Sequence, residues 1–443
     1  MKKLFFLFSY VLSVLMAAKT PIITKWQTYD GNIKVRSIGS YSYTWEQEGN
    51  AAVKGSGTVG TGITNTITFP AAGKYILKIT PDASFRFVFD HGSITSTDRS
   101  ELIELSQWGD SKWNTNMAGG FYYCGNLKIT ATDVPNFTGV TDMSNMFLSC
   151  YSITSIPNIN QWDTSSVTNM SEMFSGAQNF NGDLSGWNTS AVTNMYAMFA
   201  STQNFNGDLS GWNTSAVTNM NDMFNYATKF NSDISKWNTG KVTSMGYMFV
   251  NATAFNQDIS NWNVANVYNF NSMFSGAGSF NQNLGKWKLQ YYPSMSYMLD
   301  NSGMDCINYG RTLYGWASQS TGGRNLGAKN LIYGTEGKIY RDQLIAKGWT
   351  ISGDFYDDSC TGSVLSANDV ANKKAVKIYP NPVDATLFIN SEAAEQAYLY
   401  NTAGQMLKTI KLNKGTNSTD VSTLAKGLYI LKVGNDSFKI IKK

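Results

Sequence analysis

The chain has 443 residues, of which 42% are hydrophobic and 14% are aromatic. This composition supplies enough apolar side chains for packed cores and excludes a wholly disordered chain, and the length suggests two to four domains. Charged residues make up only 15% of the chain. Typical soluble domains carry roughly 25%.

Positive charge is concentrated at the two ends of the chain. Residues 371–443 contain 11 lysines and 5 acidic residues, a net +6, and Lys2 and Lys3 add +2. Because the total is +4, the body between the two ends carries −4. A mildly acidic body without a basic stripe argues against nucleic-acid binding.

Residues 1–18 have the pattern of a secretory signal peptide. Lys2 and Lys3 precede an apolar run at 4–16, which ends before Ala17 and Ala18. A buried N-terminal helix is the alternative for this stretch. No cysteine follows the run, which argues against a lipid-anchored lipoprotein. No later stretch approaches the roughly 18 apolar residues that a membrane-spanning helix needs, so we expect no transmembrane segment.

Residues 19–96 alternate apolar and polar side chains over short runs separated by glycine-rich turns, which predicts a small N-terminal β-sandwich. The predicted strands cover residues 22–26, 33–36, 41–45, 66–69, 75–79 and 85–89. The string at 55–60 matches the G-x-G-x-x-G pattern of nucleotide-binding loops. No helix pattern follows it, so we expect a hairpin loop instead.

A 25-residue repeat occupies the middle of the chain. It is marked by evenly spaced tryptophans: Trp162, Trp187, Trp212, Trp237, Trp262 and Trp287. Around them recurs the unit F-N-x-D-[LI]-S-x-W-N-[TV]-x-x-V-T-x-M-x-x-M-F. A period of this length is typical of a solenoid, in which each repeat buries its apolar side against its neighbours.

Each repeat suggests one short strand and one short helix. Residues 180–185 fit a strand, and the apolar side chains at offsets 0, 3, 6 and 7 of residues 192–199 fit one face of a helix. One strand and one helical turn per coil is the leucine-rich-repeat plan. We therefore expect a leucine-rich-repeat-like solenoid over residues 97–299, with the methionines and phenylalanines in its stacked core.

Polar residues also recur at fixed positions and are the candidate binding residues. One column contains Asp183, Asp208, Asp233 and Asp258, and another contains Asn181, Asn206, Asn231 and Asn256. On a strand, residues two apart share one face, so each coil would present an amide and a carboxylate together. Three interpretations stay open: ladders that satisfy backbone groups, a face that binds a glycan or a protein, and a series of calcium sites. No other cofactor is expected.

The end of the repeat array needs a cover, and residues 300–352, which lose the repeat but stay apolar, are predicted to form this C-terminal cap. Residues 353–372 read as a linker. Residues 373–443 contain about six short alternating runs, which predict a second small β-sandwich. The predicted fold class is thus a mainly β repeat protein flanked by two small β-sandwich domains.

Four cysteines in an exported chain suggest disulfides. Cys124 and Cys150 are 26 residues apart, close to one repeat, and Cys306 and Cys360 flank the predicted cap. Three pairings are possible. We favour 124–150 with 306–360, and free thiols are the alternative.

Little in the chain points to catalysis. The one histidine, His91, has no nucleophile motif near it, so a Ser-His-Asp or Cys-His site is not indicated. A single histidine also removes the commonest metal-ligand clusters, so we expect no dedicated metal site. Repeated carboxylates could suggest a glycosidase, but a repeated column offers no unique acid and base.

The repeat units at 140–299 resemble the BspA-like leucine-rich surface-protein family. The end of the chain resembles the sorting tail of Bacteroidetes type IX secretion, on Tyr379-Pro380-Asn381-Pro382, on the segment containing Gly404, on Gly427 and Tyr429, and on the basic finish. The tail resemblance implies the type IX secretion machinery as a partner and passage through the outer membrane to the cell surface. The repeat resemblance implies surface interaction, with adhesion in some members.

The sequence therefore predicts an exported, non-catalytic surface protein that binds or adheres to an extracellular protein or glycan through its solenoid. Two alternatives remain: a polysaccharide-active enzyme or its binding accessory, and a purely structural surface spacer.

Overall fold

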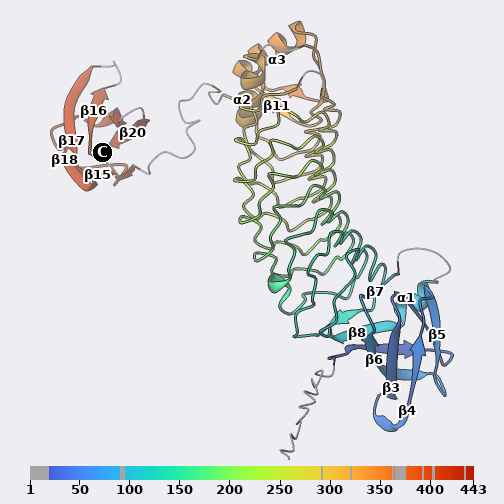
Figure 1. The fold of residues 1–443 in the computed structure, drawn as a ribbon. Helices are drawn as coiled ribbons and strands as arrows, with labels where there is room; N and C mark the ends of the chain where they lie inside the picture. The colour runs from blue at the N-terminus through green and yellow to red at the C-terminus, as the bar shows by residue number, and fades with distance from the viewer. Residues whose placement is uncertain are drawn as a thin grey trace, which may run out of the picture. The chain divides into compact units, whose positions relative to one another are not determined.

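The computed structural model describes residues 19–89, 95–290, 293–319, 322–361, 364, 376–391, 394–401, 405–433 and 436–443. The chain divides into two compact units, Met1–Val364 and Leu365–Lys443 (Figure 1). The predicted leader at 1–18, His91 and half of the predicted linker at 353–372 lie outside the described residues. Within the described residues, no helix is long and apolar enough to cross a membrane.

The first unit begins with two antiparallel-rich sheets that share one core. The larger sheet has the order β4-β3-β6-β1-β8-β9 and the smaller one the order β5-β2-β7. The strands are β1 Ile22–Thr28, β2 Asn32–Ile38, β3 Tyr41–Gln47, β4 Asn50–Val59, β5 Thr64–Thr68, β6 Gly73–Pro81, β7 Arg86–Phe87, β8 Leu102–Gln107 and β9 Lys128–Ile129. A short helix, α1 Ser96–Ser100, precedes β8. Alternate residues of β1 are buried, as the sequence pattern predicts.

The glycine string at 55–60 does not form the expected hairpin loop. Gly55 and Gly57 lie in the interior of β4, opposite Trp45 and Tyr43 of β3. A Cβ atom at Gly55 would lie 2.6 Å from the Trp45 ring, and one at Gly57 would lie 2.5 Å from the Tyr43 hydroxyl. Glycine is needed at both positions because aromatic rings of the neighbouring strand occupy the space that a side chain would take.

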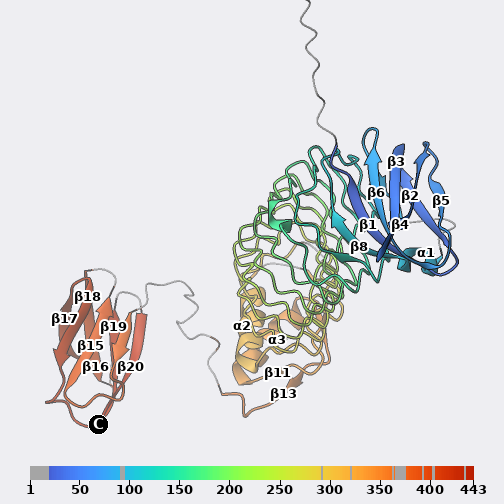
Figure 2. The same cartoon turned by 90° about the horizontal axis from the view of Figure 1, so that it is seen from below.

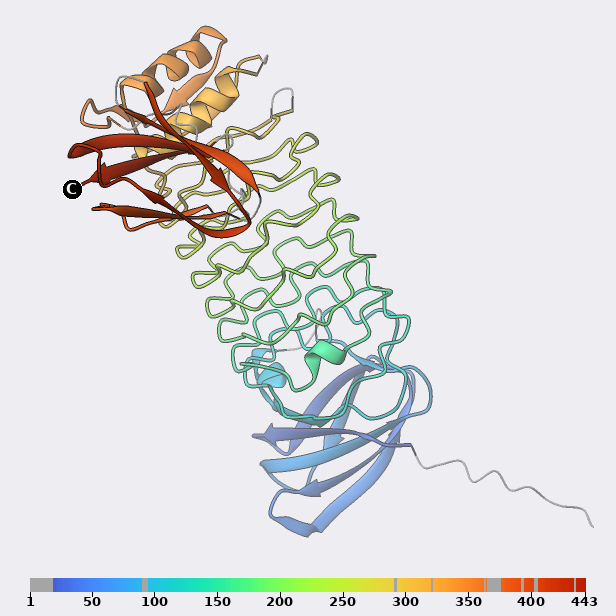
Figure 3. The ribbon, with the colours of Figure 1, turned by 90° about the vertical axis from the view of Figure 1, so that its left-hand side faces the viewer.

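Between the sheets and two C-terminal helices, the chain forms a row of stacked coils (Figure 3). The only regular helix within them, among the described residues, is the single turn η1 Ile159–Gln161. Neighbouring coils meet through one-residue parallel bridges, which connect Asn116, Asp142, Asn169, Asn194, Asn219, Ser244, Asn269 and Ser294 in turn.

Neither the strand expected at 180–185 nor the helix expected at 192–199 is present. In the second segment, backbone N–H groups alternate between two kinds of partner. Ala197 N donates to Asn221 O of the next coil at 2.9 Å, whereas Met198 N donates to Met195 O of its own coil at 3.3 Å. A helix is excluded because every second N–H is given to the neighbouring coil, and left-handed residues such as Ala197 (φ 49°) and Ser201 (φ 58°) interrupt the run.

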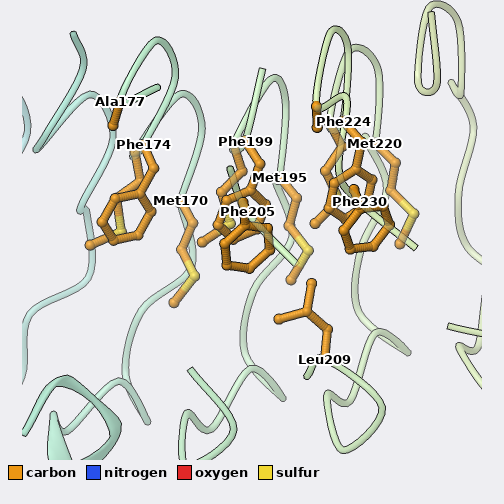
Figure 4. Packing of buried hydrophobic residues seen from close by; sticks show 14 of the residues in the cluster. Met170, Phe174, Ala177, Met195, Phe199, Phe205, Leu209, Met220, Phe224 and Phe230 are labelled. Atoms are coloured by element: carbon orange, nitrogen blue, oxygen red, sulfur yellow. The ribbon is translucent and has the colours of Figure 1, made fainter. Parts of the chain in front are cut away.

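The buried side chains of the coils stack in columns, and Figure 4 shows the same pattern of methionine and phenylalanine returning from coil to coil. The tryptophans from Trp162 to Trp262 lie 6.2–6.5 Å apart, ring centre to ring centre. Each Trp Nε1 from Trp187 onward donates to a backbone carbonyl of the preceding coil, for example Trp212 to Leu184 at 3.1 Å. The predicted stacked core is confirmed side chain by side chain.

The region after the last coil contains two helices and two parallel strand pairs. The helices are α2 Cys306–Ala317 and α3 Thr335–Ala346, and β10 Asn325–Gly327 pairs with β12 Thr350–Ser352 while β11 Ile332–Tyr333 pairs with β13 Phe355–Tyr356. Trp316 Nε1 donates to Leu284 O at 3.1 Å, which continues the tryptophan contact beyond the last repeat. Arg341 pairs with the buried carboxylate of Asp354 at 2.7 Å.

The second unit is a small two-sheet domain with its own core (Figure 2). One sheet has the order β14-β15-β18 and the other β17-β16-β19-β20. The strands are β14 Lys377–Tyr379, β15 Thr386–Ser391, β16 Glu395–Asn401, β17 Met406–Leu412, β18 Gly415–Asp420, β19 Gly427–Val433 and β20 Asp436–Lys442. In the part of the chain that the structure describes, the protein is thus mainly β, built from several small sheets, none of them closed.

Candidate ligand-binding surface

The asparagine column is a hydrogen-bonded ladder. Asn206 N donates to Asn181 Oδ1 at 2.9 Å, and the same bond recurs at each step from Asn206 through Asn231 and Asn256 to Asn281. The last rung is Asp305, whose N–H donates to Asn281 Oδ1 and whose own carboxylate caps α2. The Oδ1 atoms of this column are therefore used in holding successive coils together.

The aspartate column serves turns within each coil. Oδ1 of Asp183, Asp208, Asp233 and Asp258 accepts the backbone N–H of the serine two residues on, at 2.9–3.0 Å. The serine hydroxyl is the main cause of a lowered pKa at Asp183 and Asp233, and the serine N–H is the main cause at Asp208. These are Asx-turns, in which a side chain satisfies a nearby backbone donor.

The structure thus places the predicted residues in straight columns, but no strand carries them. Within the described residues, no group of three or more His, Cys, Asp or Glu side chains converges as a metal site would require. Each coil contributes one aspartate to the column, and a calcium ion takes six to eight oxygen ligands.

A second surface, which the repeat consensus does not reveal, carries exposed tyrosines. Within the described residues of 167–299, the exposed large hydrophobic side chains are all tyrosines: Tyr196, Tyr226, Tyr247, Tyr268 and Tyr297. All five lie in the first ten residues of a coil, counted from the repeat valine or its equivalent. The signal in the sequence was their departure from the repeat consensus.

Two carboxylates lie in the same ten-residue segments. Glu172 and Asp222 are half-buried, and burial is the main cause of a raised pKa at each, to which Asp222 adds repulsion at Glu172. Both carboxylates also raise the pKa of the Tyr196 phenol, after burial as the main cause. Tyr196 lies in the coil between theirs, and its carbonyl oxygen accepts the backbone N–H of Glu172 at 2.7 Å. We call the surface of these ten-residue segments, which carries the two carboxylates and the five tyrosines, the tyrosine face.

The side chains that donate hydrogen bonds to the carboxylate of Asp222 are amides. Asn221 Nδ2 donates to Oδ2 at 2.6 Å, and Asn225 Nδ2 donates to Oδ1 at 2.7 Å. Among the described residues, neither Asp222 nor Glu172 forms an ion pair with a lysine or an arginine. Negative charge on this face is therefore not neutralised by the protein itself.

The cysteines give one confirmed pairing and one correction. Cys306 and Cys360 form a disulfide, as predicted. Cys124 and Cys150 are buried free thiols, and Cys150 Sγ donates to Phe121 O at 3.0 Å, so the expected 124–150 bridge is absent. They occupy equivalent positions of adjacent coils, where side chains run parallel about 4.8 Å apart, farther than the ~3.8 Å between Cβ atoms in a disulfide.

One sorting-motif residue, Asn381, holds the last strand of the second unit through two side-chain hydrogen bonds. Asn381 Nδ2 donates to Lys439 O at 2.7 Å and its Oδ1 accepts from Ile441 N at 2.9 Å. Tyr379, Pro380 and Pro382 flank this residue, and Tyr379 packs on Phe388 with ring centres 5.6 Å apart. Gly427 opens β19, and Tyr429 Oη donates to Ala425 O at 2.8 Å, whereas Gly404 lies outside the described residues.

Comparison with known families matches two separate parts of the chain. Residues 115–224 and 204–308 match the family described as "Mycoplasma protein of unknown function, DUF285". Residues 377–443 match the secretion system C-terminal sorting domain. No match was found among curated proteins or among solved structures.

These matches assign the tail to a sorting-domain family, whereas the family that matches the repeats has no known function. The repeats match the DUF285 family and not a BspA-like family, so the resemblance of the repeats to BspA-like proteins stays a prediction. A tail of the type IX kind implies the corresponding secretion machinery and export to the cell surface or the extracellular space. The chain therefore carries a repeat array similar to DUF285 proteins and a C-terminal type IX sorting domain.

Proposed function

We propose that this protein is a non-catalytic binding or adhesion protein of the cell surface, which presents its coils to an extracellular ligand. In this proposal the coils are a leucine-rich-like solenoid in which methionine, phenylalanine and tryptophan take the core positions. The observation that carries the proposal is the alignment of equivalent outward-facing side chains in straight columns. Such alignment gives one continuous surface with a repeating pattern of contacts.

The bonding between coils supports a rigid presentation of that surface. Each coil donates backbone N–H groups to the next, as Glu172 N does to Tyr196 O at 2.7 Å, and threonine hydroxyls add further links, as Thr218 does to Thr193 O at 3.1 Å. A surface already ordered before binding loses less conformational entropy when a partner docks. A non-catalytic role is supported by the aspartate column. Each of its carboxylates has the same hydrogen-bond partner, so none is set apart as a catalytic acid or base.

The asparagine ladder favours one alternative, a structural spacer, because its side-chain oxygens are engaged within the protein. Binding of the full chain to an array of glycans and extracellular-matrix proteins, with and without calcium, separates the two. A surface-binding protein is retained by a specific class of ligand and releases no reducing ends from glycans. Retention by nothing on the array would support the spacer, and release of reducing ends would support an enzyme.

A further inference from the structure

We propose that the tyrosine face binds an extended, lysine- or arginine-bearing segment of a partner protein. This inference rests on the proposed surface-binding function and names the side of the coils and the chemistry of the partner. It rests on three features: the variability of the repeat positions concerned, the placement of the tyrosines, and the distribution of charge.

Variation between the repeats includes positions whose side chains make no hydrogen bond that recurs from coil to coil. The asparagine and aspartate columns hold the same residue from coil to coil, and their hydrogen bonds explain why. The two positions between the repeat methionines hold Ser-Glu172, Tyr196-Ala, Asn-Asp222, Gly-Tyr247 and Asn-Ser in successive coils. Side chains that differ among equivalent positions are not needed by the repeat itself, so a partner can read them.

The local backbone does not favour tyrosine where three of these tyrosines lie. Tyr226, Tyr247 and Tyr297 have φ of 57°, 60° and 59°, in the left-handed region. Other coils place Gly176 and Asn251 at the position of Tyr226, which are the residues that this region favours. Their rings are also 42–64% exposed, so packing does not account for them either. Exposed aromatic rings are frequent energetic centres of protein interfaces.

Charge on the face identifies the partner. The first ten residues of the five coils between 167 and 276 contain no lysine or arginine, while Glu172 and Asp222 are acidic. The lysines of these five coils lie in the remaining residues of two of them, Lys229, Lys236 and Lys241 in one and Lys286 and Lys288 in the other. A cationic side chain would pair with a half-buried carboxylate that has no such partner here, and could also lie over a tyrosine ring.

The spacing of the carboxylates suits an extended chain. Glu172 and Asp222 occupy the same position two coils apart, which is roughly 10 Å at the usual distance between neighbouring strands. An extended segment covers about the same distance in three residues. A neutral glycan would also use tyrosine rings, but it gives no reason for carboxylates to be present and basic groups absent. The cationic segment therefore accounts for more of the face.

The test is binding of the full chain to the synthetic peptide (Arg-Gly-Ser)6, with (Gln-Gly-Ser)6 as the uncharged control. The double variant Glu172→Gln/Asp222→Asn removes the charges with little change of shape. Its matched control, Asp183→Asn/Asp233→Asn, removes the same charge from the same two coils on the aspartate column. We expect Kd to rise about fivefold or more for the first variant and less than twofold for the second, with a weaker salt dependence in the first.

A second variant, Tyr226→Asn/Tyr247→Asn, tests the rings with a residue that the coils themselves carry in this conformation, and it should raise Kd about threefold or more. Equal losses in both charge variants, or no loss in either, would overturn the proposal. Binding of a neutral oligosaccharide in place of the peptide, abolished by the tyrosine variant, would overturn it as well. In each of those cases retention on the ligand array would still stand, so surface binding itself can survive the failure of this inference.

Discussion

The sheet region at the start of the chain and the coils that follow it satisfy their backbone groups in different ways. In the sheets, β1 pairs with β6 over seven consecutive residues, from Ile22–Ile79 to Thr28–Gly73. In the coils, parallel pairing lasts for one residue at a time and is repeated at every coil, as from Asn194 to Asn219. The first arrangement joins strands that are distant in sequence, whereas the second joins each coil only to its two neighbours.

This difference predicts different cooperativity. A sheet strand such as β1 contacts both β6 and β8, so damage to it reaches segments far along the chain. Stability in a stack of coils is approximately a sum of terms within coils and between adjacent coils. The two regions nevertheless share one continuous hydrophobic core, from Ile22 to Ile351. The sheet region and the coils should therefore differ most in how far the effect of a local substitution extends along the chain.

The largest expected effect is the loss of a core tryptophan in each region. Trp212→Ala removes a ring stacked 6.3 Å from Trp187 and 6.5 Å from Trp237, and Trp26→Ala removes a fully buried ring of β1. Each should cost about 3–5 kcal/mol by leaving a cavity. Hydrogen exchange should show the Trp212→Ala loss of protection confined to the adjacent coils, and the Trp26→Ala loss spread through the larger sheet.

The proposed difference between the coils and the sheets would be wrong if the loss of protection spread equally far in both variants. If Trp212→Ala removed protection from all coils together, the stack would be as cooperative as the sheet, and the nearest-neighbour description would be wrong. A global melting temperature would not decide the question, because a chain with two units and a repeat array need not unfold in a single step.

The same contrast explains what could be predicted from the sequence. In the sheets, period-two alternation predicted a strand at 22–26, which is observed as Ile22–Thr28, because burial on one face of a strand follows that period. Gly55 in β4 was missed because the Trp45 ring that covers it comes from another strand, and local pattern does not record cross-strand packing. In the coils, the period correctly indicated which side chains are buried but not their backbone conformation.

The reason lies in the three-residue spacing of the repeat. Met195 and Met198 are three apart, which fits a helix but fits equally a turn closed by the bond from Met198 N to Met195 O. The helix and the turn are distinguished by the backbone bonds to the next coil, such as the one from Ala197 N to Asn221 O. The sequence of a single repeat does not show these bonds. The candidate surface was likewise only partly predictable. The repeat revealed the asparagine and aspartate columns, but it did not reveal Tyr226 and Tyr247, which depart from the consensus.

A pH-dependent prediction sharpens the comparison through buried carboxylates. Glu101 in the sheet region is only 5% exposed, and burial, with repulsion from Asp98 and Asp30, raises its pKa to about 7. Because the folded-state pKa lies above the unfolded value of about 4.5, the folded state binds the proton more tightly. Stability should therefore fall as pH rises from about 4.5 through 7, by on the order of 2 kcal/mol.

The variant Glu101→Gln should remove that fall and should be more stable than the unaltered protein at pH 8. Hydrogen exchange of the backbone amides of β1, β6 and β8 at pH 5 and pH 8, corrected for the intrinsic pH dependence of exchange, measures it. Glu172→Gln is the comparison in the coils, and it should flatten the pH dependence less, because Glu172 is only half-buried. An unchanged pH dependence in Glu101→Gln would show that another group titrates in this range.

The smallest expected effect concerns a single rung of the asparagine ladder. Asn231 Oδ1 accepts the N–H of Asn256 at 2.9 Å and Gln257 Nε2 at 3.0 Å. Asn231→Ala removes this acceptor and should cost about 1 kcal/mol, seen as faster hydrogen exchange at the Asn256 amide. Asn231→Asp keeps an oxygen in place and should cost less. In the sheet region, Asn65 donates only to Gly62 O three residues away, so Asn65→Ala should change exchange in β5 and nowhere else. If Asn231→Ala leaves the Asn256 amide as well protected as before, the ladder does not hold the coils together, and the column becomes available as a binding surface after all.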